Sequence, residues 1–317
     1  MQPGLEDIEA AARVVYSDMA PTPQYCWPLL CEQLGAEVWV KHENHTPTGA
    51  FKLRGGLVYM ARLRQSQPCV RGVITATRGN HGQSVALAAA KVGLQAVIVV
   101  PHGNNPEKNA AMRAFGAELI EYGDDFQEAY DYAVAQAQTR GLHPIRAFDP
   151  ALVEGVATYG LEFFRAVPDL DTVYVPLGMG SGVCGLIAAR DALGLSLKIV
   201  GVVAKGAPAY ALSFEAGRVV ATEKADTIAD GVACRTPDEQ ALGIILDGAA
   251  RVVRVSDEAI EAAMGHYLSD THNLAEAAAS VPLAALLKER ESMAGKKVGL
   301  ILSGGNADKE SILRALA

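Results

Sequence analysis

Hydrophobic residues in this chain follow two alternating patterns. Short continuous apolar runs rich in Val and Ile indicate buried strands, and longer segments between them carry apolar residues at helical spacing. Strands are predicted at residues 38–41, 72–76, 96–100, 118–122, 172–175, 198–203, 251–255 and 297–302. Helices are predicted at residues 7–15, 85–92, 106–115, 125–140, 155–166 and 184–192.

This alternation favours an α/β fold, because parallel strands covered on both faces read as continuous apolar runs. The predicted strands are too many for one compact sheet. We therefore expect two doubly wound parallel-sheet domains, with the Pro-bearing segment 148–150 as a candidate hinge.

Composition narrows the class of protein. The 317 residues are 50% hydrophobic and 20% charged, which is typical of a globular chain with a substantial core. A formal net charge of -8 argues against nucleic acid or an anionic membrane surface as a partner. No apolar run approaches the roughly 20 residues that span a bilayer, and residues 1–7 lack signal-peptide character. A cytoplasmic location is therefore expected.

The cysteines and histidines give no metal signature. Five cysteines are scattered without a C-x-x-C pair, which predicts reduced thiols. His42 and His45 lie close in sequence, but no Cys or acidic cluster completes a ligand set around them. No metal site is expected.

The chemistry centres on Lys52 in the stretch TPTGAFKLRG, residues 46–55. Thr48 and Gly49 are expected to open a helix with Lys52 in its first turn. The helix dipole disfavours an ammonium there, and only a neutral amine attacks a carbonyl. Lys52 is thus a candidate for imine formation, and a solvated lysine at a helix end is the alternative.

Three further stretches follow predicted strands, where open α/β sheets place their ligand sites. They are TATRGNHGQS (75–84), PLGMGSGVCG (176–185) and LSGGN (302–306). The second also satisfies G-x-G-x-x-G, which is typical of dinucleotide-binding oxidoreductases. That alternative requires an acidic residue after the next strand, and residues 202–205 offer none. A loop whose amides bind a phosphate is favoured instead.

In this order, the four stretches resemble the fold-type II enzymes that depend on pyridoxal phosphate (PLP), a tryptophan synthase β-like group. The group includes threonine and serine dehydratases and serine racemase, and the likeness covers nearly the whole chain. It implies PLP as cofactor and a homodimer. It also implies a large PLP-binding domain of residues 1–71 and 148–317, and a small substrate-gripping domain of residues 72–147.

The resemblance also implies roles for individual residues. Lys52 would hold PLP as a Schiff base beside the Phe51 ring, Asn80 would contact the phenolic oxygen, and the Ser303 hydroxyl would bind the pyridine nitrogen. Glu276 is a weaker candidate near the ring, because the Pro that follows in relatives is missing. The residues implied to hold the phosphate are Gly178, Met179, Gly180, Ser181 and Gly182. Those implied to line the pocket for the substrate carboxylate are Thr77, Gly79 and His81.

Arg78 departs from the family, which usually has a small residue there. Serine racemase uses a serine at this place to protonate the second face of the substrate, and an arginine does not give up its proton. Arg78 therefore argues against racemase activity. Arg78 is counted with the substrate-binding residues, where it would reach a carboxylate of the substrate or of the protein; a solvated arginine is the alternative.

A second departure concerns the divalent-metal site of many relatives. Val203 and Ala209 stand where a Glu and an Asp would bind the ion, and neither can hold a hard cation. No divalent metal is expected, and Lys205 is a hypothetical substitute for its charge.

The resemblance implies β-elimination from a β-hydroxy-α-amino acid such as L-threonine or L-serine, giving a 2-oxo acid and ammonia. The neutral Ser303 hydroxyl suits elimination over transamination. Arg78 and the altered segment 154–158 leave room for phenylserine or threo-3-hydroxyaspartate, and an amino-acid racemase is a further alternative. The chain ends about a dozen residues after the SGGN segment, which favours a catabolic enzyme without a regulatory domain.

Overall fold

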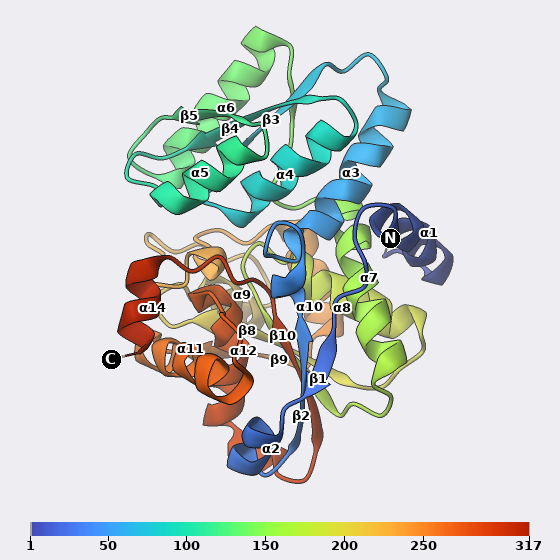
Figure 1. Cartoon of the computed structure of the whole chain (residues 1–317), viewed down its shortest axis with the longest axis vertical. Coiled ribbons are helices and arrows are strands. Elements are labelled where there is room, and N and C mark those ends of the chain that lie inside the picture. Colours follow the sequence, from blue (N-terminus) through green and yellow to red (C-terminus); the bar gives the residue numbers. More distant parts are fainter. Residues whose placement is uncertain (1, 317) are drawn as a thin grey trace.

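The computed structural model describes residues 2–316, whose strands form two separate sheets (Figure 1). The strands are β1 (Gln24–Cys26), β2 (Glu37–His42), β3 (Gly72–Ala76), β4 (Gln95–Val100), β5 (Glu118–Glu121), β6 (His143–Pro144), β7 (Thr172–Pro176), β8 (Lys198–Ala204), β9 (Arg251–Val255) and β10 (Lys297–Leu302). The helices up to the middle of the chain are α1 (Leu5–Tyr16), α2 (Pro28–Leu34), α3 (Lys52–Ser66), α4 (Asn80–Lys91), α5 (Pro106–Ala114), α6 (Phe126–Arg140) and α7 (Pro150–Ala166). The later ones are α8 (Ser181–Ala192), α9 (Ala209–Ala216), α10 (Glu239–Gly248), α11 (Asp257–Thr271), α12 (Ala277–Lys288), α13 (Arg290–Met293) and α14 (Lys309–Ala315), and two 3-10 turns are η1 (Glu43–His45) and η2 (Asp230–Val232).

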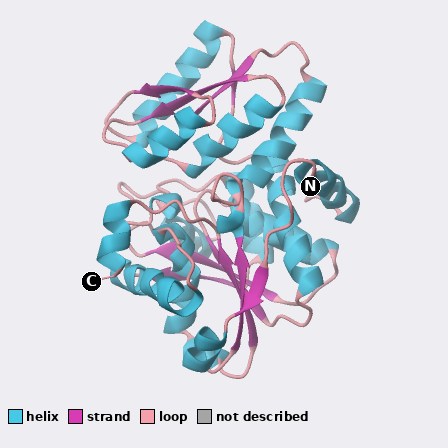
Figure 2. Cartoon of the chain, in the orientation of Figure 1, coloured by secondary structure: helices cyan, strands magenta, loops and turns pink. Residues whose placement is uncertain are grey.

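The larger sheet has the strand order β1-β2-β10-β7-β8-β9. All neighbours pair in parallel except β1, which runs antiparallel to β2 at one edge. Helices cover both faces (Figure 2), so each strand contributes to two cores. In β10, Val298 and Leu300 pack with α11 and α12, whereas Ile301 points to the opposite core formed with α7 and α8. Burial on both faces explains why this strand is apolar throughout.

The smaller sheet is fully parallel, in the order β5-β4-β3-β6. Helix α4 lies over one face and α6 over the other (Figure 1). The expectation of two doubly wound parallel sheets is therefore confirmed. The division into residues 72–147 and the two flanking segments stays a prediction, and the origin of all four strands between residues 72 and 144 supports it.

Helix α3 connects the two halves, since it packs against α4 of the smaller sheet and α7 of the larger one. Its first residue is Lys52. Strand ends bring the other three motifs to the same region: β3 leads into residues 77–80, β7 into 177–181, and β10 into 303–306. The fold thus gathers all four sequence motifs between the two sheets.

Candidate active site

The lysine segment is tied to the far end of the chain. Ala50 forms an isolated antiparallel bridge with Gly304, the Phe51 amide donates to the Ser303 carbonyl at 2.9 Å, and the Gly305 amide donates to the Gly49 carbonyl at 2.9 Å. The expected helix start at Thr48 and Gly49 was wrong. These residues form a turn that meets the 303–305 loop, and the helix begins only at Lys52. The expected first-turn position of Lys52 is confirmed.

Lys52 is a largely buried amine with one neutral partner. Its Nζ donates to the Ser181 hydroxyl at 2.9 Å and lies 4.9 Å from the centre of the Phe51 ring. Burial lowers the pKa of Lys52 to about 8, because no carboxylate compensates the lost hydration of the ammonium. A substantial fraction of the amine is therefore neutral near physiological pH and able to attack a carbonyl.

The loop between β7 and α8 forms an anion site beside this amine. Gly180 adopts a φ of 99°, and a Cβ on Gly178 would stand 2.3 Å from the Gly231 carbonyl oxygen, so both positions need glycine. Helix α8 begins at Ser181, and the first amides of a helix have no intrahelical partner. Together with the helix dipole they favour a phosphate, close to the Lys52 amine.

Asn80 is fixed by two partners from the C-terminal part of the chain. Its Oδ1 accepts from Asn306 Nδ2 at 2.9 Å, and its Nδ2 donates to Glu276 Oε1 at 2.6 Å. Asn306 Nδ2 also donates to the Thr48 carbonyl at 2.9 Å. The weaker candidate Glu276 thus lies in the network that orients Asn80 and joins the lysine segment to the motifs of β3 and β10.

Two buried side chains, Glu276 of this network and His81 next to Asn80, each have a polar atom without a partner within residues 2–316, namely Glu276 Oε2 and His81 Nε2. Burial raises the pKa of Glu276 to about 7. Burial, helped by the charge of Lys52, lowers the pKa of His81 to about 3. Buried polar atoms are normally hydrogen-bonded, so these two unpartnered atoms indicate a polar ligand. Together with the Lys52 amine and the anion site, they fit a cofactor that carries a carbonyl, a phosphate and ring polar atoms. PLP has this donor and acceptor set.

The stretch after β3 forms the opening of α4. The Thr77 hydroxyl accepts from the Gly79 amide at 3.1 Å, and α4 begins at Asn80. The buried residues Thr77, Gly79 and His81 therefore surround a helix N-terminus, as a carboxylate pocket requires. Arg78 between them is exposed, and its side chain makes no hydrogen bond or ion pair within residues 2–316. The alternative that it pairs with a carboxylate of the described protein was therefore wrong.

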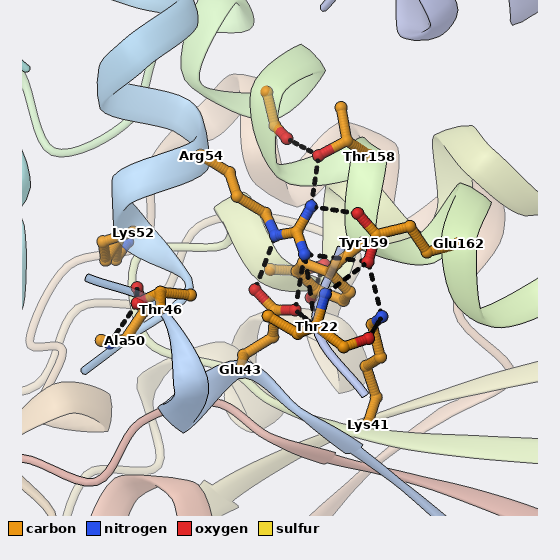
Figure 3. Close-up of polar contacts among 12 residues, drawn as sticks. Thr22, Lys41, Glu43, Thr46, Ala50, Lys52, Arg54, Thr158, Tyr159 and Glu162 are labelled. Atoms are coloured by element: carbon orange, nitrogen blue, oxygen red, sulfur yellow. Dashed lines mark hydrogen bonds and ion pairs between the residues drawn. The ribbon is translucent and has the colours of Figure 1, made fainter. Parts of the chain in front are cut away.

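Sequence reasoning missed a buried ionic cluster two residues after the lysine (Figure 3). Arg54 Nε donates to Glu43 at 2.7 Å and its Nη1 donates to Glu162 at 2.6 Å. Lys41 Nζ also donates to Glu162, at 2.5 Å, and Thr158 accepts from Arg54. The signal was present in the sequence, because single charged residues inside apolar runs must find opposite charges when buried.

The ion pair between Lys108 Nζ and Asp230 Oδ2, 2.5 Å apart, was also missed. It connects α5 of the smaller sheet to η2 near the larger one. Lys108 packs on the carboxylate pocket, since a Cβ on Gly79 would lie 2.6 Å from Lys108 Cδ. The two residues are 122 positions apart, so no local pattern could pair them.

The described residues contain no group of three or more His, Cys, Asp and Glu side chains placed to hold a metal ion. Val203 and Ala209 are buried apolar residues, and Lys205 is exposed. The proposed charge substitution by Lys205 stays a prediction. No helix between residues 2 and 316 has the length and apolar character to cross a membrane.

Comparison with known proteins agrees with this geometry. Residues 15–304 match the family described as pyridoxal-phosphate dependent enzyme. The L-threonine ammonia-lyase of Geobacter sulfurreducens is 38% identical over 285 residues, covering 89% of this chain and 70% of that protein. The L-threo-3-hydroxyaspartate ammonia-lyase of Saccharomyces cerevisiae is 32% identical over 308 residues, covering 96% and 94%. The structure of processed threonine deaminase isoform 2 from Solanum lycopersicum superposes with a TM-score of 0.90 at 29% identity, covering 99% and 94%.

The chain therefore belongs to the family of PLP-dependent enzymes. Within that family it is a fold-type II enzyme of the serine/threonine dehydratase group. The expectations of family, fold class and cofactor from the four motifs are confirmed.

Proposed function

We propose that this enzyme catalyses β-elimination of a β-hydroxy-α-amino acid, with L-threonine and L-serine as the first candidates, and releases a 2-oxo acid and ammonia. The observation that carries the proposal is the Lys52 amine. It is largely buried, has a pKa lowered to about 8, and lies against Ser181 at the N-terminus of α8. The similarity to threonine ammonia-lyases supports the same reaction.

The geometry supports the cofactor-binding residues that the resemblance implies. Lys52 would hold PLP, with Phe51 beside the ring and the Ser303 hydroxyl at the pyridine nitrogen. Asn80, fixed by Asn306 and Glu276, would contact the phenolic oxygen. When bound, PLP supplies an electron sink that stabilises negative charge at the substrate Cα. The residues proposed to hold its phosphate are Gly178, Met179, Gly180, Ser181 and Gly182.

Lys52 would also act as the general base. Its neutral amine removes the Cα proton, because a pKa near the working pH balances availability and basicity. The β-hydroxyl would leave as water, taking a proton from the cofactor phosphate or from a bound water. A further water would hydrolyse the released enamine product to the 2-oxo acid and ammonia. Thr77, Gly79 and neutral His81 would hold the substrate carboxylate at the start of α4.

A racemase is the second candidate, and the side chain at position 78 argues against it. A racemase needs a second proton donor on the opposite face of Cα. Arg78 keeps its proton at neutral pH, so this position cannot supply it. An NAD-type oxidoreductase would leave the buried Lys52 amine without a role.

The test is 2-oxo acid release from L-threonine, L-serine, phenylserine and threo-3-hydroxyaspartate by the PLP-loaded wild type and Lys52→Ala. Turnover that is lost in the variant supports the proposal. The proposal would be overturned if the protein absorbs at about 410 nm, as bound PLP does, but releases no 2-oxo acid from any of these substrates.

We also propose that the enzyme works as a homodimer in the cytoplasm, in amino-acid catabolism. The resemblance to the dehydratase group supports these assignments. Light scattering of the purified protein tests the dimer, and a monomer at working concentration would contradict it.

A further inference from the structure

Arg78 lines a cavity of about 240 Å³ between the two sheets. From the smaller sheet, the wall includes Arg78 and Lys108. From the larger one, it includes Asp230, Glu276 and Asp308. Glu276 also holds Asn80, and Lys108 packs on Gly79, so the cavity adjoins the proposed substrate pocket. It has room for roughly eight waters at about 30 Å³ each, which is enough for a small polar side chain.

Most charges on this wall already have partners. Lys108 pairs with Asp230 at 2.5 Å. Asp308 accepts from Asn105 Nδ2 at 2.9 Å and from the Ser311 amide at 2.7 Å.

The two remaining charged residues of the wall, Arg314 and Glu276, also have partners, unlike Arg78. Arg314, which also borders the cavity, is held by Glu261 and Glu310. Glu276 Oε1 accepts from Asn80 Nδ2 at 2.6 Å, and burial raises the pKa of its carboxyl. Within residues 2–316, Arg78 is the cation of this wall that has no ion-pair or hydrogen-bond partner.

An unpaired guanidinium on the wall of a small cavity favours an anionic ligand. Its planar fork matches a carboxylate with two parallel hydrogen bonds, which fixes orientation as well as charge. Arg78 is flanked by Thr77 and Gly79, the residues proposed to hold the α-carboxylate. A group bound by Arg78 would therefore be a second anion on the same substrate.

We propose that Arg78 selects substrates that carry a second carboxylate on Cβ, so that the preferred substrate is a β-hydroxy-α-amino diacid. This inference rests on the proposed function and names the substrate class of the same site. The carboxylates of the wall already have partners of their own: Asp230 pairs with Lys108, Asp308 accepts from Asn105, and Glu276 accepts from Asn80. Threonine and serine would be accepted more weakly, because neither offers Arg78 a partner.

The experiment compares kcat/KM for L-threo-3-hydroxyaspartate and L-threonine in the PLP-loaded wild type, Arg78→Gln, Arg78→Lys and Arg113→Gln. Arg113 is an exposed arginine on α5 outside the cavity and serves as the matched control. The wild type should prefer the diacid. The ratio of the two values should fall about 100-fold in Arg78→Gln, as loss of hydrogen bonds between charged groups implies, and should fall less in Arg78→Lys. Arg113→Gln should keep the wild-type ratio.

A second readout separates this inference from the reaction itself. Succinate is a dicarboxylate that cannot undergo elimination, and its binding to the PLP-loaded protein can be followed through the cofactor absorbance. Its dissociation constant should rise about 100-fold in Arg78→Gln. Equal succinate binding and equal substrate ratios in wild type and Arg78→Gln would overturn the inference. Tight, Arg78-dependent succinate binding without turnover of any substrate would uphold the anion subsite and overturn the proposed reaction.

Discussion

Lys52 and Arg54 lie two residues apart at the start of α3, and their surroundings are opposite. Lys52 has a neutral hydroxyl as its partner, and burial lowers its pKa to about 8. Burial would also lower the pKa of Arg54, but Glu43 and Glu162 raise it above its ordinary value. The Lys52 amine therefore loses its proton readily, whereas the Arg54 guanidinium stays charged. The first turn of α3 therefore carries both the reactive amine, Lys52, and an anchor, by which we mean the ion pairs of Arg54 with Glu43 and Glu162 that hold this turn in place.

The largest expected effect is the loss of turnover when Lys52 is replaced. Lys52→Ala should lower 2-oxo acid release at least ~10⁴-fold, since it removes both the group that holds the cofactor and the general base. The anchor is untouched, so the variant should unfold at the same temperature as the wild-type apoprotein or above it. Lys91→Ala, at an exposed position on α4, is the control. Turnover within about tenfold of wild type would contradict the assignment.

Breaking the anchor should instead cost stability. Arg54→Met leaves Glu43 and Glu162 buried without their guanidinium, and the free energy of unfolding should fall by about 3–5 kcal/mol. Urea titration measures the loss. Arg62→Met, on the same helix but at a half-exposed pair with Glu154, should cost about 0–1 kcal/mol. Similar losses in the two variants would mean that the cluster does not anchor α3.

Alkaline pH sharpens the comparison. An unfolded lysine keeps its proton up to about pH 10.5, whereas Lys52 in the folded apoprotein loses it near pH 8. Between these values the unfolded state binds more protons, so stability rises with pH. The difference in unfolding free energy between wild type and Lys52→Met should grow in favour of wild type by at most about 3 kcal/mol. A flat difference from pH 8 to 10.5 would show that Lys52 has an ordinary pKa.

The smallest expected effect on activity concerns Glu276. Its raised pKa of about 7 means that the folded state holds a proton which the unfolded state loses from about pH 4.5. Wild-type stability should therefore fall as pH rises through this window, and Glu276→Gln should lack the fall. Glu276→Ala removes the acceptor of Asn80 and should lower kcat/KM about fivefold, near the net value of one hydrogen bond. If stability depended on pH in the same way in Glu276→Gln and wild type, the pKa of Glu276 would not be raised.

The sequence predicted the central strands well, because β3, β7 and β10 are continuous apolar runs. The short strands β1 and β6 were missed, since two or three residues carry no periodicity. Helix α7 begins earlier than expected: Asp149 caps it and Pro150 occupies its first turn, which had been interpreted as a hinge. At the site, the glycine loops and Lys52 were predictable from local chemistry and resemblance. The charged residues of the Arg54 cluster stood out within apolar runs, but which of them pair could not be predicted, nor could the pair of Lys108 with Asp230, because the partners are distant in sequence.

The position of β10 has a consequence for how the enzyme is made. This strand, residues 297–302, lies inside the larger sheet between β2 and β7, and the loop after it completes the site through Ala50 and Gly304. The smaller sheet uses only strands between residues 72 and 144 and can assemble while the rest is still being translated. The larger sheet has a gap at its centre until the last strand arrives. Pairing of β10 with β2 closes a loop of 260 residues, from Glu37 to Lys297. This closure is slow, and apolar strand edges are exposed to aggregation until it is complete.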